Sequence, residues 1–334
     1  MKNILITGVT GFVGSHLAEY ILNNHQDYKV FGTYRHRSDR ENIQFLENKI
    51  FLVECEMTDS HSVSACIKEI RPYKIFHLAA QSYVPSSWNA PQETFNINIG
   101  GTLNLFEAIR EIKNNYFNEH KSYDPVIQIA CSSEEYGFVK MSEVPIKETN
   151  ELRPLSPYGV SKVTQEMLAY QYYQSYGLKT IITRAFNHTG PRRGEIFVCS
   201  NFAKQIAEIE INKKAPIIHV GNLETYRDFT DVRDMVRAYW LATDFCNYAE
   251  PYNICSGETH KIKDILIKLL FFSTNKNITI KEGLAKLRPS DVPLLYGDNT
   301  KFVRATDWKP EIDFDQTLKD ILKYWRMKVK NDNL

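Results

Sequence analysis

Short runs of β-branched and apolar residues alternate with amphipathic stretches through the first half of the chain. The runs cover residues 4–7, 29–34, 50–53, 74–78, 126–131 and 180–185. Between the first two, Val13, Leu17 and Ile21 recur at helical spacing and predict a helix with one buried face. This rhythm predicts an α/β fold with a doubly wound parallel sheet whose crossovers are right-handed.

After about residue 186 the pattern loosens into connections rich in Gly, Pro and Arg. A helix is expected near residues 201–212 and a short strand at 217–220, whereas residues 231–243 and 252–255 regain the earlier rhythm. The predicted division is a main domain of residues 1–186 with 228–256, interleaved with a smaller α/β annex of residues 187–227 and 257–334.

A glycine-rich segment follows the first predicted strand directly. Gly8, Gly11 and Gly14 have the spacing GxxGxxG and stand at the opening of the first predicted helix. At this place in a βαβ unit, glycines let main-chain N–H groups approach phosphates, and the helix N-terminus favours negative charge. The position predicts a Rossmann-type dinucleotide-binding domain at residues 1–186, with the annex as the substrate-binding domain.

The residues after the second predicted strand bear on the choice of dinucleotide. NAD sites place an acidic residue there to bind the ribose 2′-hydroxyl, but this chain has Arg35, His36 and Arg37. Because guanidinium groups bind phosphate through charge-assisted hydrogen bonds, NADP is the expected cofactor, with Arg35 the first candidate for its 2′-phosphate. Arg35, Arg37 and Arg40 could instead form a solvated basic face.

Tyr158 and Lys162 lie four residues apart, hence on one face of a predicted helix that begins after Ser156. The preceding strand, residues 126–131, ends at Ser132, and ligands of such sheets bind beyond the carboxyl ends of the strands. The Lys162 ammonium lowers the cost of a tyrosinate, so Tyr158 could take a proton from a sugar hydroxyl while nicotinamide takes hydride. Ser132 could bind the same oxygen. A chance surface pair is the alternative.

Several motifs together resemble those of extended short-chain dehydrogenases/reductases (SDRs) that modify nucleotide sugars. They are the three glycines above, residues 78–82, 98–102 and 132–137, and the pair Tyr158 and Lys162. More narrowly, four further segments are similar to GDP-mannose 4,6-dehydratases. These are residues 184–195, 220–223, 227–228 and 287–293.

The resemblance implies a reaction with no net oxidation, in which NADP removes hydride from sugar C4, water leaves across C5 and C6, and the hydride returns to C6. Glu134 matches the family's C5 base, whose task is feasible because the neighbouring C4 ketone acidifies that proton. Ser132 stands where the family usually has threonine and keeps the hydroxyl. The implied catalytic residues are Ser132, Glu134, Tyr158 and Lys162.

The same resemblance implies the binding residues and the assembly. Those for the cofactor are Gly8, Thr10, Gly11, Phe12, Val13, Gly14, Arg35, Glu56, Met57, Leu78, Ala79, Ala80, Tyr158, Lys162, His188 and Arg193. Those for the nucleotide sugar are Ser82, Ser133, Asn187, Val198, Arg227 and Arg288. Each could equally be an ordinary surface or capping residue. A homodimer or homotetramer is implied, with the loop at Arg192 and Arg193 reaching a neighbouring subunit.

Three departures from the family pattern leave alternatives open. Residues 56–59 replace the usual acid-Leu-Thr-Asp, so the adenine contact could shift. Asn201 stands where many members have a lysine, so GDP-manno-heptose is a candidate substrate as well as GDP-mannose. Residues 133–137 also resemble reductases, so a GDP-4-keto-6-deoxy-sugar reductase, or another nucleotide-sugar dehydrogenase or epimerase, is a second hypothesis. A non-enzymatic NADP-sensing regulator is a third, against which the intact catalytic residues argue.

The composition limits the binding partners and the cellular compartment that the sequence predicts. With 41 Lys and Arg against 40 Asp and Glu, the chain has no overall field to attract nucleic acid or a membrane. Its six cysteines show no CxxC or Cys/His cluster, which predicts no metal site and no disulfide framework and favours a reducing compartment. The longest later apolar stretch, around residues 265–272, is too short to span a bilayer. We expect a cytoplasmic enzyme whose partner is a GDP-sugar.

Overall fold

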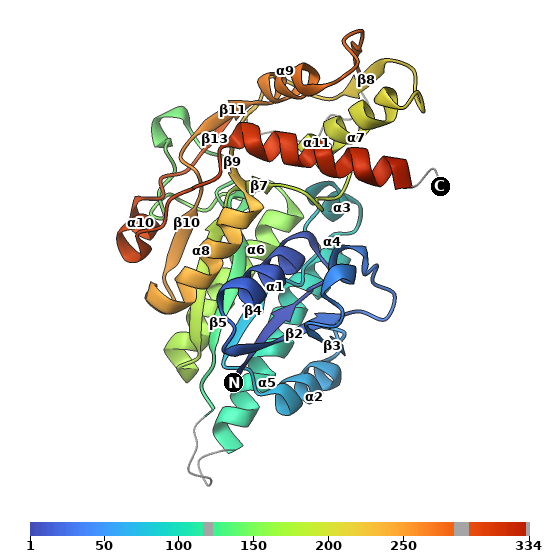
Figure 1. Ribbon diagram of the computed structural model, residues 1–334. Helices are drawn as coiled ribbons and strands as arrows, with labels where there is room; N and C mark the ends of the chain where they lie inside the picture. The colour runs from blue at the N-terminus through green and yellow to red at the C-terminus, as the bar shows by residue number, and fades with distance from the viewer. Residues whose placement is uncertain (116–122, 284–293, 332–334) are drawn as a thin grey trace.

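The computed structural model describes residues 1–115, 123–283 and 294–331, and a seven-stranded parallel sheet forms its centre (Figure 1). The strand order is β3-β2-β1-β4-β5-β6-β10, so the chain builds outward from β1 in both directions. The predicted doubly wound α/β fold is confirmed, and the six predicted strands are present within two residues of their expected bounds. They are β1 (Lys2–Thr7), β2 (Tyr28–Tyr34), β3 (Phe51–Glu54), β4 (Lys74–His77), β5 (Val126–Ser132) and β6 (Lys179–Ala185), and β10 (Pro251–Ile254) completes the sheet.

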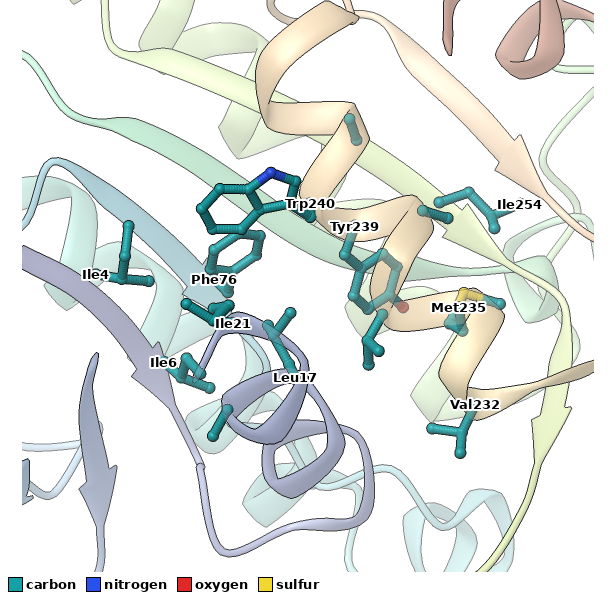
Figure 2. Close-up of a cluster of buried hydrophobic side chains, with 14 of the residues drawn as sticks. Ile4, Ile6, Leu17, Ile21, Phe76, Val232, Met235, Tyr239, Trp240 and Ile254 are labelled. Carbon is teal, nitrogen blue, oxygen red and sulfur yellow. The ribbon is translucent and has the colours of Figure 1, made fainter. Parts of the chain in front are cut away.

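Helices cover both faces of this sheet. The helices α1 (Phe12–Asn24) and α8 (Val232–Phe245) lie on one face, where Figure 2 shows Leu17 turned toward the α8 side chains. The opposite face is covered by α2 (Ser60–Ile70), α5 (Gly101–Asn115) and α6 (Pro157–Tyr176). Successive β1 side chains alternate between the two cores, since Ile4 belongs to the first and Leu5 to the second. Burial on both faces explains why the strands appear in the sequence as nearly continuous apolar runs.

A smaller α/β annex lies beyond the carboxyl ends of the central strands (Figure 1). Its helices share one apolar core and are α7 (Val198–Glu210), α9 (Ile262–Phe272) and α11 (Phe314–Asn331). The helix predicted near residues 201–212 is α7, which begins three residues earlier. One annex sheet contains β7 (Asn187–Thr189), β9 (Tyr226–Asp231), β11 (Thr259–Lys261) and β13 (Leu294–Leu295), and a second pairs β8 (Ile217–Val220) with β12 (Thr279–Glu282).

The chain passes between the two regions more than once. After the first annex segment it returns through α8 to β10, which pairs with β6. Phe302 of α10 (Thr300–Thr306) and Trp308 come from the part of the chain expected in the annex, yet both are buried in the core between α1, α8 and the sheet. Short helices α3 (Val84–Asn89) and α4 (Pro91–Phe95) connect β4 to α5.

Within the described ranges, no helix combines the length and the apolar character needed to cross a membrane.

Candidate active site

One large cleft lies between the carboxyl ends of the central strands and the annex. Its volume is about 1690 Å³, whereas a pocket for one drug-sized ligand measures roughly 300–1,000 Å³, so two ligands have room. Every described residue that the sequence predicted for the site lines this cleft, from the Gly8 loop to Arg227. Arg288 lies outside the described residues. The structure thus brings the predicted residues together, while their individual binding roles stay predictions.

The glycine-rich loop joins β1 to α1 at one end of the cleft. Gly8 has a φ of 71°, a conformation that favours glycine. A Cβ on Gly14 would lie 2.5 Å from the Gly8 carbonyl oxygen and 2.8 Å from Val9 Cα, so loop and helix pack too closely for a side chain. Gly11 precedes α1 and has no side chain to cap it, which leaves the first main-chain N–H groups to a ligand. This cradle fits a pyrophosphate.

The wall at the end of β2 carries charges of both signs. Arg35 is exposed and lines the cleft, and the Arg40 guanidinium lies 4.1 Å from the ring centre of Tyr34. Asp39 also lines the cleft, and its carboxylate accepts a hydrogen bond from the Glu41 N–H at 2.8 Å. Sequence spacing did not point to Asp39, because it stands beyond the usual position of the ribose-binding acid.

Two aromatic rings enclose Arg193 deep in the cleft. Its guanidinium lies 3.6 Å from the ring centre of Phe197 and 4.8 Å from that of Phe12. Burial lowers the pKa of Arg193 to about 10, and the guanidinium stays charged at neutral pH. His188 stacks on Phe12 with parallel rings 6.0 Å apart, and burial lowers the pKa of His188 to about 3, so the imidazole is neutral. Arg193 therefore offers a partly buried positive charge to an anionic ligand.

The start of α6 is fixed by the signal that the sequence predicted. The Ser156 hydroxyl accepts a hydrogen bond from the Gly159 N–H at 3.0 Å, and Pro157 occupies the first helical position. Tyr158 therefore stands in the first turn and Lys162 in the next, on the face that lines the cleft.

Tyr158 and Lys162 are both buried beside the end of β5. Lys162 Nζ donates to the Ala130 carbonyl at 2.7 Å. Burial raises the pKa of Tyr158 above its ordinary value, while the Ser132 hydroxyl nearby lowers it. Burial also lowers the pKa of Lys162. Burial thus opposes tyrosinate formation, and positive charge close to the phenol would offset this effect.

A tight turn at the end of β5 holds the two other predicted catalytic residues. Ser132 Oγ accepts a hydrogen bond from the Glu134 N–H at 3.2 Å, and Glu135 Oε1 accepts one from the Ser132 N–H at 2.8 Å. These reciprocal bonds form a capping box. Because Glu134 lines the cleft and Glu135 is fully buried, the turn presents only the first carboxylate beside Tyr158.

Behind this turn, Glu135 and Glu166 share a buried pocket with Arg184. Arg184 donates to both Glu166 oxygens, at 2.6 and 2.8 Å, and lies 3.7 Å from Glu135. Burial and the Glu166 carboxylate raise the pKa of Glu135 well above its ordinary value. Cys131 adds a third potential metal ligand here, but Arg184 already supplies the compensating positive charge.

Asn98 supports the site from behind the cleft wall; the sequence analysis used its segment, residues 98–102, for the family resemblance but gave Asn98 no role. It is fully buried in a π-helical turn, η2 (Asn96–Gly100), before α5. Its Nδ2 donates to Ser161 Oγ and its Oδ1 accepts from the Gln81 N–H, both at 2.8 Å. Asn98 thereby ties the loop after β4 to α6 between Tyr158 and Lys162. Such turns often occur at functional sites, but no spacing in the sequence indicates this one.

The annex wall contains a lysine close to Asn201. Asn201 Nδ2 donates to the Glu195 carbonyl at 3.1 Å, and Asn201 Oδ1 accepts from Gln205 Nε2 at 2.8 Å. Lys204, almost one turn later on α7, lines the cleft and forms an ion pair with the Glu195 carboxylate. A lysine is therefore present in this wall even though Asn201 stands at the family's lysine position.

Arg192 makes contacts within its own chain, and its predicted reach to a neighbouring subunit stays a prediction. Its φ is 70°, and its guanidinium folds back on α1 of the same chain. There it contacts His16 and forms an ion pair with Glu19 at 2.5 Å. The carboxylate of Glu19 compensates the Arg192 charge within the chain.

Comparison with known sequences gives the family. The model for GDP-mannose 4,6 dehydratase matches residues 5–321. The chain is 30% identical over 331 residues to a GDP-6-deoxy-D-mannose reductase of Pseudomonas aeruginosa, with 99% of both chains covered. It is 31% identical to a GDP-mannose 4,6 dehydratase of Cricetulus griseus, over 96% of this chain and 91% of that relative.

Solved structures agree with this result. RMD from Pseudomonas aeruginosa, complexed with NADPH, has a TM-score of 0.83 at 28% identity and covers 98% of this chain and 100% of its own. A UDP-glucose 4-epimerase from Thermotoga maritima with UDP-glucose has the same TM-score and identity, over 98% of this chain and 99% of its own. The chain belongs to the GDP-mannose 4,6-dehydratase family of extended SDR enzymes.

Proposed function

We propose that the protein is an NADP-dependent GDP-sugar 4,6-dehydratase, which converts GDP-mannose or GDP-manno-heptose to the 4-keto-6-deoxy sugar. The observation that carries the proposal is the turn after β5, which presents Glu134 to the cleft that Tyr158 and Ser132 also line. Oxidation at C4 needs a base for the hydroxyl proton, and elimination needs a second base for the C5 proton. Tyr158 and Glu134 supply these two bases from one wall.

Each acid-base step falls to a side chain of the cleft. Tyr158 takes the C4 hydroxyl proton while Ser132 binds the same oxygen, and the ammonium of Lys162 stabilises the phenolate. Bound NADP would supply the hydride chemistry, from C4 and back to C6, and the positive charge of its oxidised nicotinamide. Glu134 removes the C5 proton, which the C4 ketone acidifies, and passes it to the C6 hydroxyl, which leaves as water. After hydride has returned to C6, C5 takes up a proton in place of the one that the C4 hydroxyl gave to Tyr158.

The choice of NADP rests on Arg35. Its exposed guanidinium lies in the cleft wall at the end of β2, where a 2′-phosphate would accept two parallel hydrogen bonds. The related RMD from Pseudomonas aeruginosa was solved with NADPH, which supports the same choice. The Asp39 carboxylate lines the same wall and would repel a 2′-phosphate, so the phosphate would bind on the Arg35 side.

A second function is favoured by one comparison. The relative from Pseudomonas aeruginosa that matches 99% of this chain is a GDP-6-deoxy-D-mannose reductase. Reduction of a 4-keto sugar would use Tyr158 as the acid and would leave Glu134 without a proton to remove. The two functions therefore differ in what they ask of Glu134.

Product analysis tests the proposal against this alternative. The protein is incubated with NADP and either GDP-mannose or GDP-manno-heptose, and the products are weighed by mass spectrometry. A dehydratase yields a nucleotide sugar lighter by one water with no net change in NADPH absorbance. Stoichiometric NADPH consumption with a 4-keto-6-deoxy sugar, and no water loss from either GDP-sugar, would select the reductase.

We also propose a homodimer or homotetramer. On α6, Val160, Met167 and Tyr170 form an apolar stripe that is between 41% and 51% exposed, and Leu103 on α5 is 40% exposed. Burying such a stripe against a second copy would remove apolar surface from water. Sedimentation equilibrium that returned the monomer mass of 38.8 kDa would contradict this assembly.

A further inference from the structure

Two cysteines beside the cleft have no part in the proposed reaction. Cys55 follows β3 directly and lines the cleft, and Cys66 lies on α2. Both are buried in the same apolar core, where 2% of Cys55 and 4% of Cys66 is exposed. We propose that Cys55 and Cys66 form a dithiol site that a peroxide entering the cleft oxidises to an intrachain disulfide.

Two separate contacts bring these side chains together. Ser62 Oγ accepts a hydrogen bond at 3.1 Å from the N–H of Glu56, the residue after Cys55. Cys66 stands four residues after Ser62 and therefore lies on the same face of α2. The thiols of Cys55 and Cys66 also interact with each other, and this interaction shifts the pKa of both. The end of β3 and α2 thus already meet at the two sulfurs.

The two thiols differ in access to the cleft, and the difference sets their roles. Cys55 is among the residues that line the cleft and Cys66 is not, so an oxidant in the cleft meets Cys55 first. Interaction with the Cys66 thiol, helped by Ser62, outweighs burial and lowers the pKa of Cys55. Because the thiolate is the nucleophile, Cys55 attacks the oxidant and Cys66 resolves the product.

The reaction balances with hydrogen peroxide as the oxidant. The Cys55 thiolate attacks one peroxide oxygen, the O–O bond breaks, and the departing hydroxide takes up the proton that Cys55 had released. The Cys66 sulfur then attacks the sulfenic sulfur of Cys55, the S–S bond forms, and the S–O bond breaks. The second hydroxide leaves as water with the Cys66 proton. Two thiols lose two electrons, and peroxide is reduced to two waters.

One consequence rests on the proposed function. The residues after Cys55, Glu56 and Met57, also line the cleft in the region expected to seat adenine. Bound NADP would then cover Cys55 and slow its oxidation. The formation of the disulfide itself does not depend on the cofactor.

The test uses the full chain, treated with hydrogen peroxide and digested without reduction. We expect the intact mass to fall by two hydrogens, a thiol count two below the six of the reduced chain, and a cross-linked peptide containing Cys55 and Cys66. Six remaining thiols, or a cross-link between other cysteines, would overturn the proposal. This measurement on the parent protein does not depend on the folding of any variant.

Three single-cysteine variants and one incubation with NADP extend the test. Cys66→Ser should lose the cross-link and leave a sulfenic acid at Cys55 that a 1,3-dione traps, whereas the matched control Cys246→Ser should keep the cross-link. Trapping at Cys66 in Cys55→Ser would contradict the assigned order of attack. If the cross-link forms as fast with saturating NADP as without it, the proposed dithiol site is supported, but the proposed position of bound NADP over Cys55 is wrong.

Discussion

The ammonium of Lys162 lies 5.7 Å from the centre of the Tyr158 ring and is held there by its hydrogen bond to a main-chain carbonyl of β5. The two residues stand on consecutive turns of α6, so their spacing in the sequence becomes a fixed separation in the cleft. Since burial makes the phenol less acidic, a fixed cation beside it is the chain's own means of opposing that effect.

Removal of the Tyr158 hydroxyl should stop the chemistry and spare the fold. For Tyr158→Phe we expect kcat to fall by about 10²–10⁴, the range for loss of a positioned acid-base group. NADPH binding, measured by fluorescence titration, should persist. Tyr173→Phe, on the same helix outside the cleft, is the matched control and should retain the parent kcat. A Tyr158→Phe enzyme as fast as the parent would exclude the phenol as the base.

Glu134→Gln should separate oxidation from elimination. The amide cannot take the C5 proton, yet the C4 hydroxyl still faces Tyr158, so NADPH absorbance should build up in proportion to enzyme and water loss should cease. The control Glu111→Gln, at an exposed site on α5, should behave like the parent. Release of 4-keto-6-deoxy sugar by Glu134→Gln at the parent rate would mean that another residue is the base.

Arg35→Ala should change the preference between the two dinucleotides. Loss of a charge-assisted contact worth about 1.5–3 kcal/mol weakens NADPH binding roughly tenfold to a hundredfold. NADH, which lacks the 2′-phosphate, should bind as before. Arg37→Ala, which removes a neighbouring exposed guanidinium, is the control. Equal losses for both dinucleotides would show that Arg35 does not contact the 2′-phosphate.

His77 should make the stability of the protein fall in acid. Its Nδ1 lies 2.9 Å from Thr7 Oγ1, and that hydroxyl already accepts from the Leu78 N–H, so it donates to the ring. The other ring nitrogen lies 3.0 Å from Thr102 Oγ1. Burial lowers the pKa of His77 from 6.5 to about 3, so a charged ring is excluded from the folded protein above that value.

The sign follows from proton counting. Between pH 6.5 and about 3 the unfolded chain binds more protons at this residue, so its contribution to stability is complete above 6.5 and is lost as the pH falls. The slope is at most about 1.4 kcal/mol per pH unit. The free energy of unfolding, measured with urea at several pH values in this window, should change less steeply with pH for His77→Gln than for the exposed control His61→Gln. Equal slopes would contradict a neutral His77.

Local patterns account for what the sequence predicted well. The central strands are buried on both faces, so their apolar runs are continuous and their bounds differ from prediction by no more than two residues. Ser156 and Pro157 fix the start of α6 through contacts within one turn, which is why the position of Tyr158 could be foreseen. Gly14 could be foreseen for the same reason, because its close contacts are with the preceding loop.

The remainder depends on contacts between distant parts of the chain. Asn98 acquires its role by bridging Gln81 and Ser161, and Arg192 folds back on Glu19, which is 173 residues away along the chain. Phe302 is buried beneath helices that precede it by many residues. No periodicity or local motif contains such pairings, so the sequence analysis used residues 98–102 for the family resemblance without giving Asn98 a role, and it did not foresee the contact between Arg192 and Glu19.

The most direct test of the central claim follows the hydrogen on C4. GDP-mannose carrying deuterium at C4 is incubated with the protein and NADP, and the product is examined by NMR, with GDP-manno-heptose labelled in the same way as the second substrate. The account predicts a 4-keto-6-deoxy sugar with the deuterium at C6. A product without deuterium at C6 would contradict it. So would a protein that converts neither labelled GDP-sugar but reduces a 4-keto sugar when NADPH is supplied.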